Sequence, residues 1–362
     1  MSYTTINKST DYFNTKLYTG NNADGNAITG VGHSPDFVWI KQQNAMSHRF
    51  YDKIRGVNSA LSSDNSDSAN QYAAYGQFES FDSDGFTVGV GTNTDGTQGY
   101  GTNQNSQSIA SWNWKANGAG SANTDGTINS TVSVDTTSGF SIVKYVGNDT
   151  AGATVGHGLG VVPKMIIVKR ISGSAQDWIV YHGANTSAPE TDYLMLNSTN
   201  GTGDSAGVWN DTAPTSSVFS LGSASSVNGG GGADSFIAYC FAEKVGYSKI
   251  GSYVGNGNAD GAFIYTGFKP AWLLIKMTTT NGDRWVMLDS KRDTFNVSNK
   301  GIYADDAQAE NPVTSEQGLD ILSNGFKIRN SNTKTNTSGS TYIYIAIGQS
   351  LVGSNNVPCT AR

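Results

Sequence analysis

The chain has 362 residues, only 14% of which are charged, and its formal net charge is −6. Lysine and arginine are scattered singly, which argues against nucleic-acid binding, because nucleic-acid-binding proteins normally carry a basic stripe. No stretch approaches the roughly 18 continuous apolar residues of a membrane helix, and the N-terminus lacks the basic-then-apolar pattern of a secretory signal. We therefore expect a soluble protein with no nucleic-acid or membrane partner, assembled in a reducing cytoplasm.

The residue types favour many short strands joined by turns. There are 44 glycines, and Ser, Thr, Asn and Asp crowd the gaps between apolar runs. Seven Trp, 17 Tyr and 14 Phe supply ample apolar area for a packed core, which argues against disorder. The two cysteines do not suggest a disulfide framework, and Cys240, inside an apolar run, is predicted to be a small buried hydrophobe.

A recurring phrase divides the chain into three similar parts. Tyr-x-Gly-Asn occurs at Tyr18, Tyr145 and Tyr253, and each copy is followed by a proline, an apolar run and a lysine six residues after the proline. Nine residues beyond each lysine stands a large aromatic residue. The proline–lysine–aromatic sets are Pro35, Lys41 and Phe50; Pro163, Lys169 and Trp178; and Pro270, Lys276 and Trp285.

Strand patterns fill each part in the same order. Segments such as "SIVKYVG" alternate apolar and polar residues, as a half-buried strand does, whereas "MIIVK" and "AWLLIK" predict strands buried on both faces. No segment shows a sustained helical period, although residues 309–323 could hold one helical turn. The prediction is an all-β chain of three tandem antiparallel β-sandwiches, jelly-roll or lectin-like, each with six to eight strands. Its parts are residues 1–116, a connector at 117–138, repeats at 139–244 and 245–350, and a tail at 351–362.

The Tyr-x-Gly-Asn phrase is typical of a turn that ends the first strand of each repeat. We expect the tyrosine to pack over the sandwich edge with its hydroxyl on a backbone group. The following Gly20, Gly147 and Gly255 would adopt positive φ, and each Asn would bond its own backbone. Calcium is the functional alternative for this loop, since Asp24 and Asp260 recur in it. However, no acidic loop fits the twelve-residue calcium pattern.

Catalytic and metal-binding patterns are absent from the sequence. His33 and His157 stand in equivalent turns before a proline, which suits a hydrogen bond in the turn better than a catalytic base. The recurring Asp52–Arg55 and Asp289–Arg292 pairs are interpreted as ion pairs at strand ends, worth about 0–1 kcal/mol each if exposed. No pair of carboxylates stands out for glycoside hydrolysis. We therefore expect no enzyme, no cofactor and no metal.

Two aromatic residues in polar loops are candidate sugar-stacking platforms. Trp209 in "AGVWNDTAP" and Tyr100 in "TQGYGTN" lie outside the predicted strands, among Gly, Asn and Thr. Such a ring can stack on a sugar face, bury in a protein interface or simply anchor its loop.

Long stretches of the sequence resemble a known group of proteins. "NTDGTINSTVSVDTTSGFSIVKYVGNDTAGATVGHGLGVVPKMIIVKR" at 123–170, "FIAYCFAEKVGYSKIGSYVGNGNADGAFIYTGFKPAWLLIK" at 236–276 and "LDILSNGFKIRNS" at 319–331 are similar to segments of structural proteins of tailed bacteriophages, marine ones especially. "FVWIKQQNAMSHRFYDKIRG" at 37–56 resembles the first unit. The chain departs at "IAIGQS" (345–350), where many relatives repeat an Ala-Glu ending.

The resemblance implies a role for the protein but no catalytic or binding activity, because that family has no assigned biochemical activity. No functional residues can therefore be carried over from it. It implies a bacteriophage virion protein displayed on the particle surface, as a capsid decoration or fibre or a tail-fibre component, with an adhesive role. Its partners would be other virion proteins, as a homo-oligomer or in multiple copies per particle, and host cell-surface glycans. The alternatives are a carbohydrate-binding adhesin and, less favoured, a polysaccharide depolymerase. Many β-sandwiches bind sugars, but that step is an analogy of fold.

Overall fold

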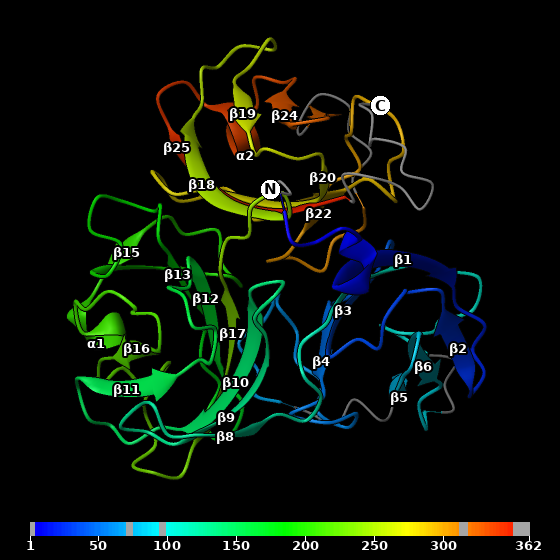
Figure 1. The fold of residues 1–362 in the computed structure, drawn as a ribbon. Helices are drawn as coiled ribbons and strands as arrows, with labels where there is room; N and C mark the ends of the chain where they lie inside the picture. The colour runs from blue at the N-terminus through cyan, green and yellow to red at the C-terminus, as the bar shows by residue number, and fades with distance from the viewer. Residues whose placement is uncertain (1–3, 70–74, 94–98, 311–317, 350–362) are drawn as a thin grey trace.

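The computed structural model describes residues 4–69, 75–93, 99–310 and 318–349, and these form an almost entirely β structure. Pairs of antiparallel sheets gather into three lobes around a common centre (Figure 1). The all-β prediction is confirmed. The helical turn considered at 309–323 falls partly on residues 311–317, outside the described residues, and strand β23 (Leu319–Leu322) occupies its end.

The first lobe pairs a sheet of order β1-β7-β3-β4 with a sheet of order β2-β6-β5. Strand β3 is buried on both faces, as the apolar run "FVWI" predicts, because one face covers the lobe's own core and the other faces the centre of the molecule. The elements are η1 (Ser9–Asp11), β1 (Phe13–Thr19), β2 (Asn26–Thr29), β3 (Phe37–Gln42), β4 (Arg49–Asp52), β5 (Gln77–Asp82), β6 (Gly85–Gly89) and β7 (Ser108–Trp114).

The second lobe has a larger main sheet, of order β15-β14-β13-β12-β17-β10-β9-β8, packed with the pair β11-β16. Its elements are β8 (Ser121–Asn123), β9 (Ser130–Asp135), β10 (Phe140–Val146), β11 (Ala153–Gly156), β12 (Met165–Arg170), β13 (Ile179–His182), β14 (Asp192–Met195), β15 (Gly203–Asp204), α1 (Ala206–Trp209), β16 (Val218–Leu221) and β17 (Ser235–Phe241). Strands β8 and β9 come from the segment interpreted as a connector. The alternating "STVSVD" of β9 pairs antiparallel with β10 and extends the sheet.

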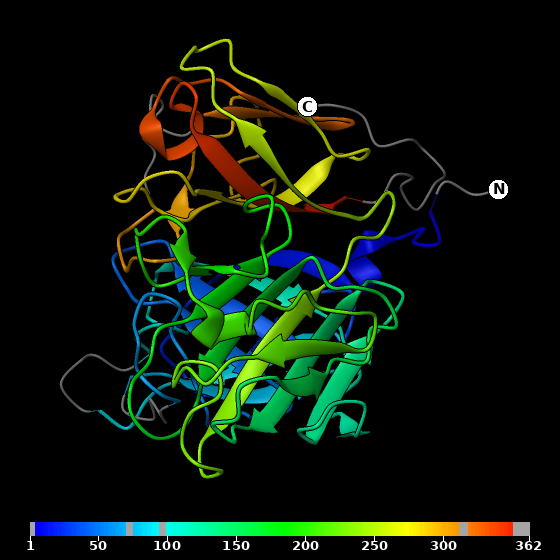
Figure 2. The same cartoon turned by 90° about the vertical axis from the view of Figure 1, so that its left-hand side faces the viewer.

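The third lobe pairs a sheet of order β18-β25-β20-β21-β22 with one of order β19-β24-β23. Figure 2 shows it stacked above the main sheet of the second lobe. Its elements are β18 (Ser248–Val254), β19 (Phe263–Tyr265), β20 (Pro270–Met277), β21 (Val286–Asp289), β22 (Ile302–Tyr303), β23 (Leu319–Leu322), β24 (Gly325–Ile328), α2 (Thr333–Asn336) and β25 (Thr341–Gly348).

The same strand order recurs in all three main sheets: β1-β7-β3-β4, β10-β17-β12-β13 and β18-β25-β20-β21. The register recurs too, because Tyr18, Tyr145 and Tyr253 lie opposite Ile109, Phe236 and Tyr342 on the second strand of each sheet. This recurrence lets residues be compared between lobes. The exact repeat boundaries stay a prediction.

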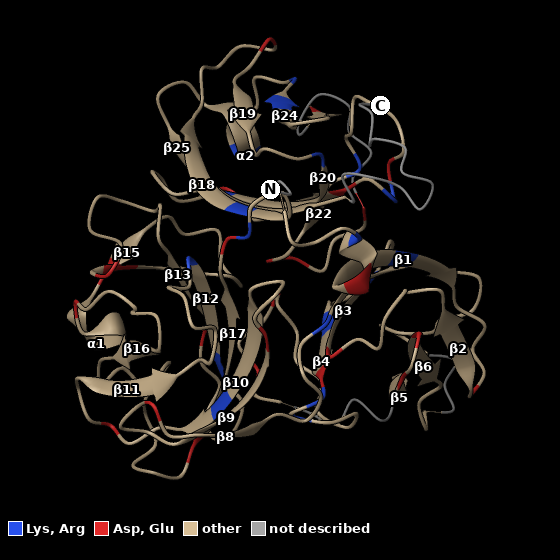
Figure 3. Ribbon diagram, in the orientation of Figure 1, with Lys and Arg blue, Asp and Glu red and all other residues tan. Residues whose placement is uncertain are grey.

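Each lobe has its own core between its two sheets, and a fourth core lies where the lobes meet. The central core takes residues from all three main sheets, and many of them are aromatic. The lobes are therefore packed together into one body and are not independent domains. Charged residues are dispersed along the ribbon in Figure 3, without a continuous stripe of either sign.

Candidate functional site

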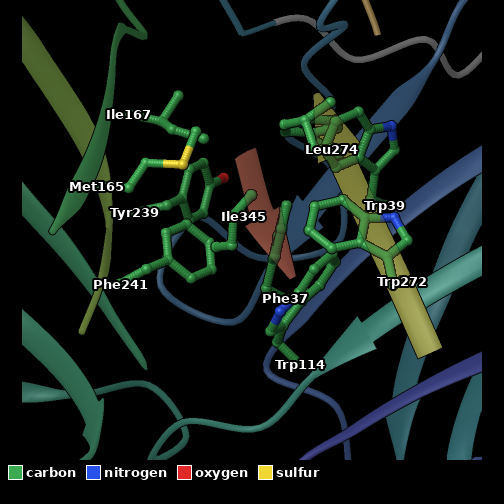
Figure 4. A pocket seen from close by; sticks show the side chains of 11 residues that line it. Phe37, Trp39, Trp114, Met165, Ile167, Tyr239, Phe241, Trp272, Leu274 and Ile345 are labelled. Carbon is green, nitrogen blue, oxygen red and sulfur yellow. The ribbon is translucent and has the colours of Figure 1, made fainter. Parts of the chain in front are cut away.

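The centre of the molecule is a closed aromatic core. Figure 4 shows side chains converging from the first lobe (Phe37, Trp39, Trp114), the second (Met165, Ile167, Tyr239, Phe241) and the third (Trp272, Leu274, Ile345). Phe37 stacks on Tyr239 with ring centroids 4.4 Å apart, and Trp114 meets Trp272 edge-on at 5.5 Å. The remaining cavity is about 10 Å³, close to the least that holds one water. The centre therefore holds the lobes together and offers no ligand site.

A ring of side-chain hydrogen bonds surrounds this core. In each lobe the residue just before strand β4, β13 or β21 uses a ring nitrogen to contact a main-chain carbonyl of the neighbouring lobe. The three acceptors occupy equivalent positions. The bonds join Trp178 Nε1 to Ser62 O (2.8 Å), Trp285 Nε1 to Met195 O (2.8 Å) and His48 Nε2 to Tyr303 O (2.8 Å). They link the second lobe to the first, the third to the second and the first to the third. The circle of lobes is thus closed.

The position of His48 corrects the predicted alignment of Phe50 with Trp178 and Trp285. The strand register places Phe50 opposite Trp39, in the position that Val180 holds opposite Ile167 in the second lobe. His48 therefore stands where the other lobes have tryptophan. The count of nine residues after the lysine was misleading, because the loop after Lys41 is two residues shorter than its counterparts.

The three lysines that close the apolar runs form a second ring. Each is fully buried, and its ammonium donates to carbonyls of its own loop and to one carbonyl of the neighbouring lobe. The acceptors in the neighbouring lobe are Ala307 O for Lys41 (3.4 Å), Ser66 O for Lys169 (2.7 Å) and Thr199 O for Lys276 (3.0 Å). Burial lowers the pKa of Lys41 to about 7 and the pKa values of Lys169 and Lys276 to about 8.

The predicted Asp–Arg ion pairs are present but buried, so the small contribution expected of an exposed pair does not apply to them. The side chains of Asp52 and Arg55 are 0% exposed, as are those of Asp289 and Arg292. Each pair lies under a neighbouring lobe, whose aromatic side chain donates a hydrogen bond to the carboxylate. Those bonds are Tyr239 Oη to Asp52 Oδ2 (2.8 Å) and Trp112 Nε1 to Asp289 Oδ2 (3.1 Å). The pairs therefore belong to the contacts between lobes.

At the remaining contact, between the second and third lobes, both the aspartate and the aromatic donor are replaced by other residues. His182 stands in the position of the aspartate, and Ile345 stands where Tyr239 and Trp112 donate. His182 Nε2 instead contacts Tyr344 O at 3.2 Å. Because the charge and its donor are absent together, no carboxylate is left buried without a partner at this contact.

The turn after Tyr-x-Gly largely agrees with its prediction. Each tyrosine hydroxyl donates to a main-chain carbonyl: Tyr18 to Thr102, Tyr145 to Val227 and Tyr253 to Thr335, at 2.6–2.8 Å. Each Asn of the phrase accepts a bond from the N–H two residues later, as expected.

The glycines of that turn have a different role from the predicted one. Gly20, Gly147 and Gly255 do not adopt positive φ. They allow close approach instead, since a Cβ on Gly255 would lie 2.3 Å from Thr337 O. The left-handed residue is the one after the Asn, for example Asp149 with φ 56°.

Each turn is held by a buried asparagine that sequence reasoning missed. Asn103, Asn228 and Asn336 are fully buried. Their side-chain oxygens accept the N–H of Asn21, Asn148 and Asn256, at 3.1, 2.9 and 2.9 Å. In so Asn-rich a chain only their spacing is a signal, because Asn228 and Asn336 each lie 83 residues after their tyrosine.

The two candidate sugar platforms lie in different places, and the structure does not bring them together. Trp209 is 2% exposed and packs edge-on against Tyr181, at 5.9 Å, as the last residue of α1. Its ring is therefore not available for stacking on a sugar, and of the alternatives above it takes the role of a loop anchor. Tyr100 is half-buried in a turn of the first lobe.

The histidines and the recurring aspartates take part in internal bonds. His33 Nδ1 contacts Thr10 O at 2.9 Å, and His157 Nε2 contacts Thr215 O at 3.1 Å, as expected for bonds within turns. Burial lowers the pKa of both imidazoles. Asp260 pairs with Lys327 at 2.7 Å, and Asp24 accepts from Val90 N. Among the described residues no group of three or more His, Cys, Asp or Glu side chains could hold a metal ion.

One polar pocket lies at the contact between the first and third lobes. We call it the seam pocket; its volume is about 220 Å³. It is lined by Ser9, Thr10, Phe13, Asn14 and Thr15 of the first lobe and by Ala271, Ser290, Lys291 and Gln349 of the third. None of the described residues that line it is acidic.

The chain belongs to the family described as Domain of unknown function (DUF7483), whose model matches residues 8–350. The match covers all three lobes. The comparisons with curated proteins and with solved structures found no match. Among the described residues no helix is long and apolar enough to cross a membrane.

Proposed function

We propose that this protein is a structural component of a bacteriophage virion, displayed on the particle surface as a capsid decoration or fibre or as part of a tail fibre. The closed ring of contacts between lobes carries the proposal. Two rings of buried hydrogen bonds, two buried Asp–Arg pairs and an aromatic core join the lobes, so a single chain forms one compact body.

Such a body suits a mechanical and adhesive role. Its buried ionisable groups are engaged with carbonyls and with each other, not directed into a cavity, and its loops point outward from the three lobes (Figure 1). The resemblance of long stretches to structural proteins of tailed phages supports the same role. In this proposal the neighbours of the chain are other virion proteins, and copies of it recur over the particle.

The location of the chain on purified particles tests the proposal. Cryo-electron microscopy of particles of the phage that encodes it should show density into which the three-lobed body fits, on the outer surface of head or tail. Mass spectrometry of the same particles, after density-gradient purification, should detect its peptides in stoichiometric amounts. Absence of the chain from purified particles would falsify the proposal.

A further inference from the structure

The seam pocket has an equivalent place at the contact between the first and second lobes, where the chain itself fills the space. At the contact between the first and second lobes, Asp36 and Lys53 occupy the positions of Ala271 and Ser290. There Asp36 accepts the N–H groups of Ala116 (2.6 Å) and Gly118 (3.2 Å) as the chain passes to the second lobe. In the seam pocket the small Ala271 and Ser290 stand in these positions, and none of the described lining residues supplies a carboxylate there.

The lining of the seam pocket is rich in groups that bind hydroxyls and carboxylates. Four lining side chains carry a hydroxyl, two carry an amide and one carries an ammonium. Both amides already donate within the protein, Asn14 Nδ2 to Val31 O (2.8 Å) and Gln349 Nε2 to Ser290 Oγ (2.7 Å). Thr15 is 5% exposed, and its Oγ1 has no partner among the described residues. A buried polar atom without a partner is costly, so a polar ligand that reaches it gains a hydrogen bond.

Charge selects the kind of polar ligand. Lys291 is exposed at the pocket and forms no ion pair among those found in the described residues. The nearest acidic side chains of its own segment are engaged: Asp289 with Arg292, and Asp293 with the N–H of Asn299. The pocket therefore presents one uncompensated cation and several neutral polar groups.

The volume of the seam pocket limits the size of its ligand. About 220 Å³ is below the roughly 300–1,000 Å³ of pockets for drug-sized ligands, so the pocket holds one small unit. A hexuronic acid unit combines this size with several hydroxyls and a single carboxylate.

We propose that the seam pocket binds a hexuronic acid unit of an acidic polysaccharide, with its carboxylate at Lys291 and a hydroxyl group at Thr15 Oγ1. This inference rests on the adhesive part of the proposed function. It places adhesion at the contact between two lobes, at residues other than the loop aromatics that the sequence suggested.

Titration of the full-length protein with single sugars tests the inference. Glucuronic and galacturonic acids, followed by ¹⁵N chemical shifts, should shift the amides of Phe13, Asn14 and Gln349. Glucose and galactose should bind at least tenfold more weakly, since a hydrogen bond to a charged group is worth about 1.5–3 kcal/mol. Acetate, which carries the charge without hydroxyls, should also bind at least tenfold more weakly.

Two substitutions and a control locate the binding. Lys291→Ala should weaken uronic acid binding about tenfold or more, and Ser290→Trp, which fills the pocket, should abolish it. Lys144→Ala removes a half-buried lysine from the second lobe and should leave affinity unchanged. All variants should show wild-type unfolding curves.

Three results would overturn the inference: no shift at pocket amides with any sugar, equal affinity for acetate and uronic acids, or binding only after residues 350–362 are removed. A chain found on virions but silent in these titrations would refute the seam-pocket inference alone. A chain that binds uronic acids but is absent from virions would refute the proposed function alone.

Discussion

At the scale of single residues, the repeated phrase was interpreted correctly as a turn but for an incomplete reason. The hydroxyl contact of Tyr253 could be predicted, because an amphipathic ring at a sheet edge needs a polar partner. The role of Asn336 could not, because its partners lie about 80 residues earlier and nothing local distinguishes it from other asparagines. The sequence likewise left open whether Trp209 stacks on a sugar or anchors its loop, since its polar neighbours in sequence are not its surroundings in space.

Asn336→Ala should lower the free energy of unfolding by about 2–4 kcal/mol, because it removes the bonds to Asn256 N–H and Asn258 O and leaves the buried carbonyl of Asn330 without its side-chain donor. Urea titration followed by tryptophan fluorescence measures the change. Asn129→Ala, at an exposed position, is the control and should change it by less than about 0.5 kcal/mol. Equal effects of the two variants would show that the buried asparagine does not hold the turn.

Lys41 should make stability rise with pH. Its folded pKa of about 7 lies below the unfolded value near 10.4, so between these values the unfolded chain binds more protons and the free energy of unfolding increases as pH rises. Lys169 and Lys276 act in the same direction. Lys41→Met should reduce the slope between pH 7 and about 9.5 by roughly a third, as one of three similar groups. Lys8→Met, an exposed lysine, should leave the slope unchanged; a flat wild-type profile would contradict the expectation.

At the scale of elements, the strands that could be predicted are those whose pattern is decided locally. β3, β12 and β20 are continuous apolar runs, and each is buried on both faces. β9 was missed although its "STVSVD" alternates, because it stands in a polar segment that looked like a linker. The Asp–Arg pairs at the ends of β4 and β21 were placed correctly in the chain but not in space, since the lobe that covers each pair is distant in sequence.

Asp52→Asn should cost about 3–5 kcal/mol of unfolding free energy, because it leaves the Arg55 guanidinium buried without its counter-charge. The matched control is Asp11→Asn, which breaks an exposed pair with Lys8 and should cost less than about 0.5 kcal/mol. Both losses can be measured by urea titration at pH 7. A small loss for Asp52→Asn would mean that the guanidinium regains solvent when its partner is removed.

At the scale of the whole molecule, the all-β class followed from the sequence, but the closure of the lobes into one body did not. Closure depends on contacts such as Trp178 to Ser62 and Trp112 to Asp289, which join residues more than 100 positions apart. Local patterns carry no information about such pairs. A chain of three separate sandwiches and a closed ring of three would show the same strand periodicity.

The full chain should unfold in one cooperative transition, because each lobe shares the central core with the other two. A fragment of residues 117–244, which holds the second lobe alone, should fail to form a stable monomer, since its central face would expose Ile167, Val180 and Tyr239 to water. Calorimetry of the chain and sedimentation of the fragment measure these outcomes. Separate transitions for the lobes, or a stable monomeric fragment, would contradict them.

The contact between the third and first lobes has a consequence for biosynthesis. Trp112, His48 and Lys41 of the first lobe form hydrogen bonds with Asp289, Tyr303 and Ala307 of the third. These partners are translated more than 150 residues later. Until the third lobe is translated, the central aromatic side chains of the first two lobes stay exposed to solvent. A prematurely terminated chain would therefore be prone to aggregate, and only a complete chain would leave the ribosome with this apolar surface buried.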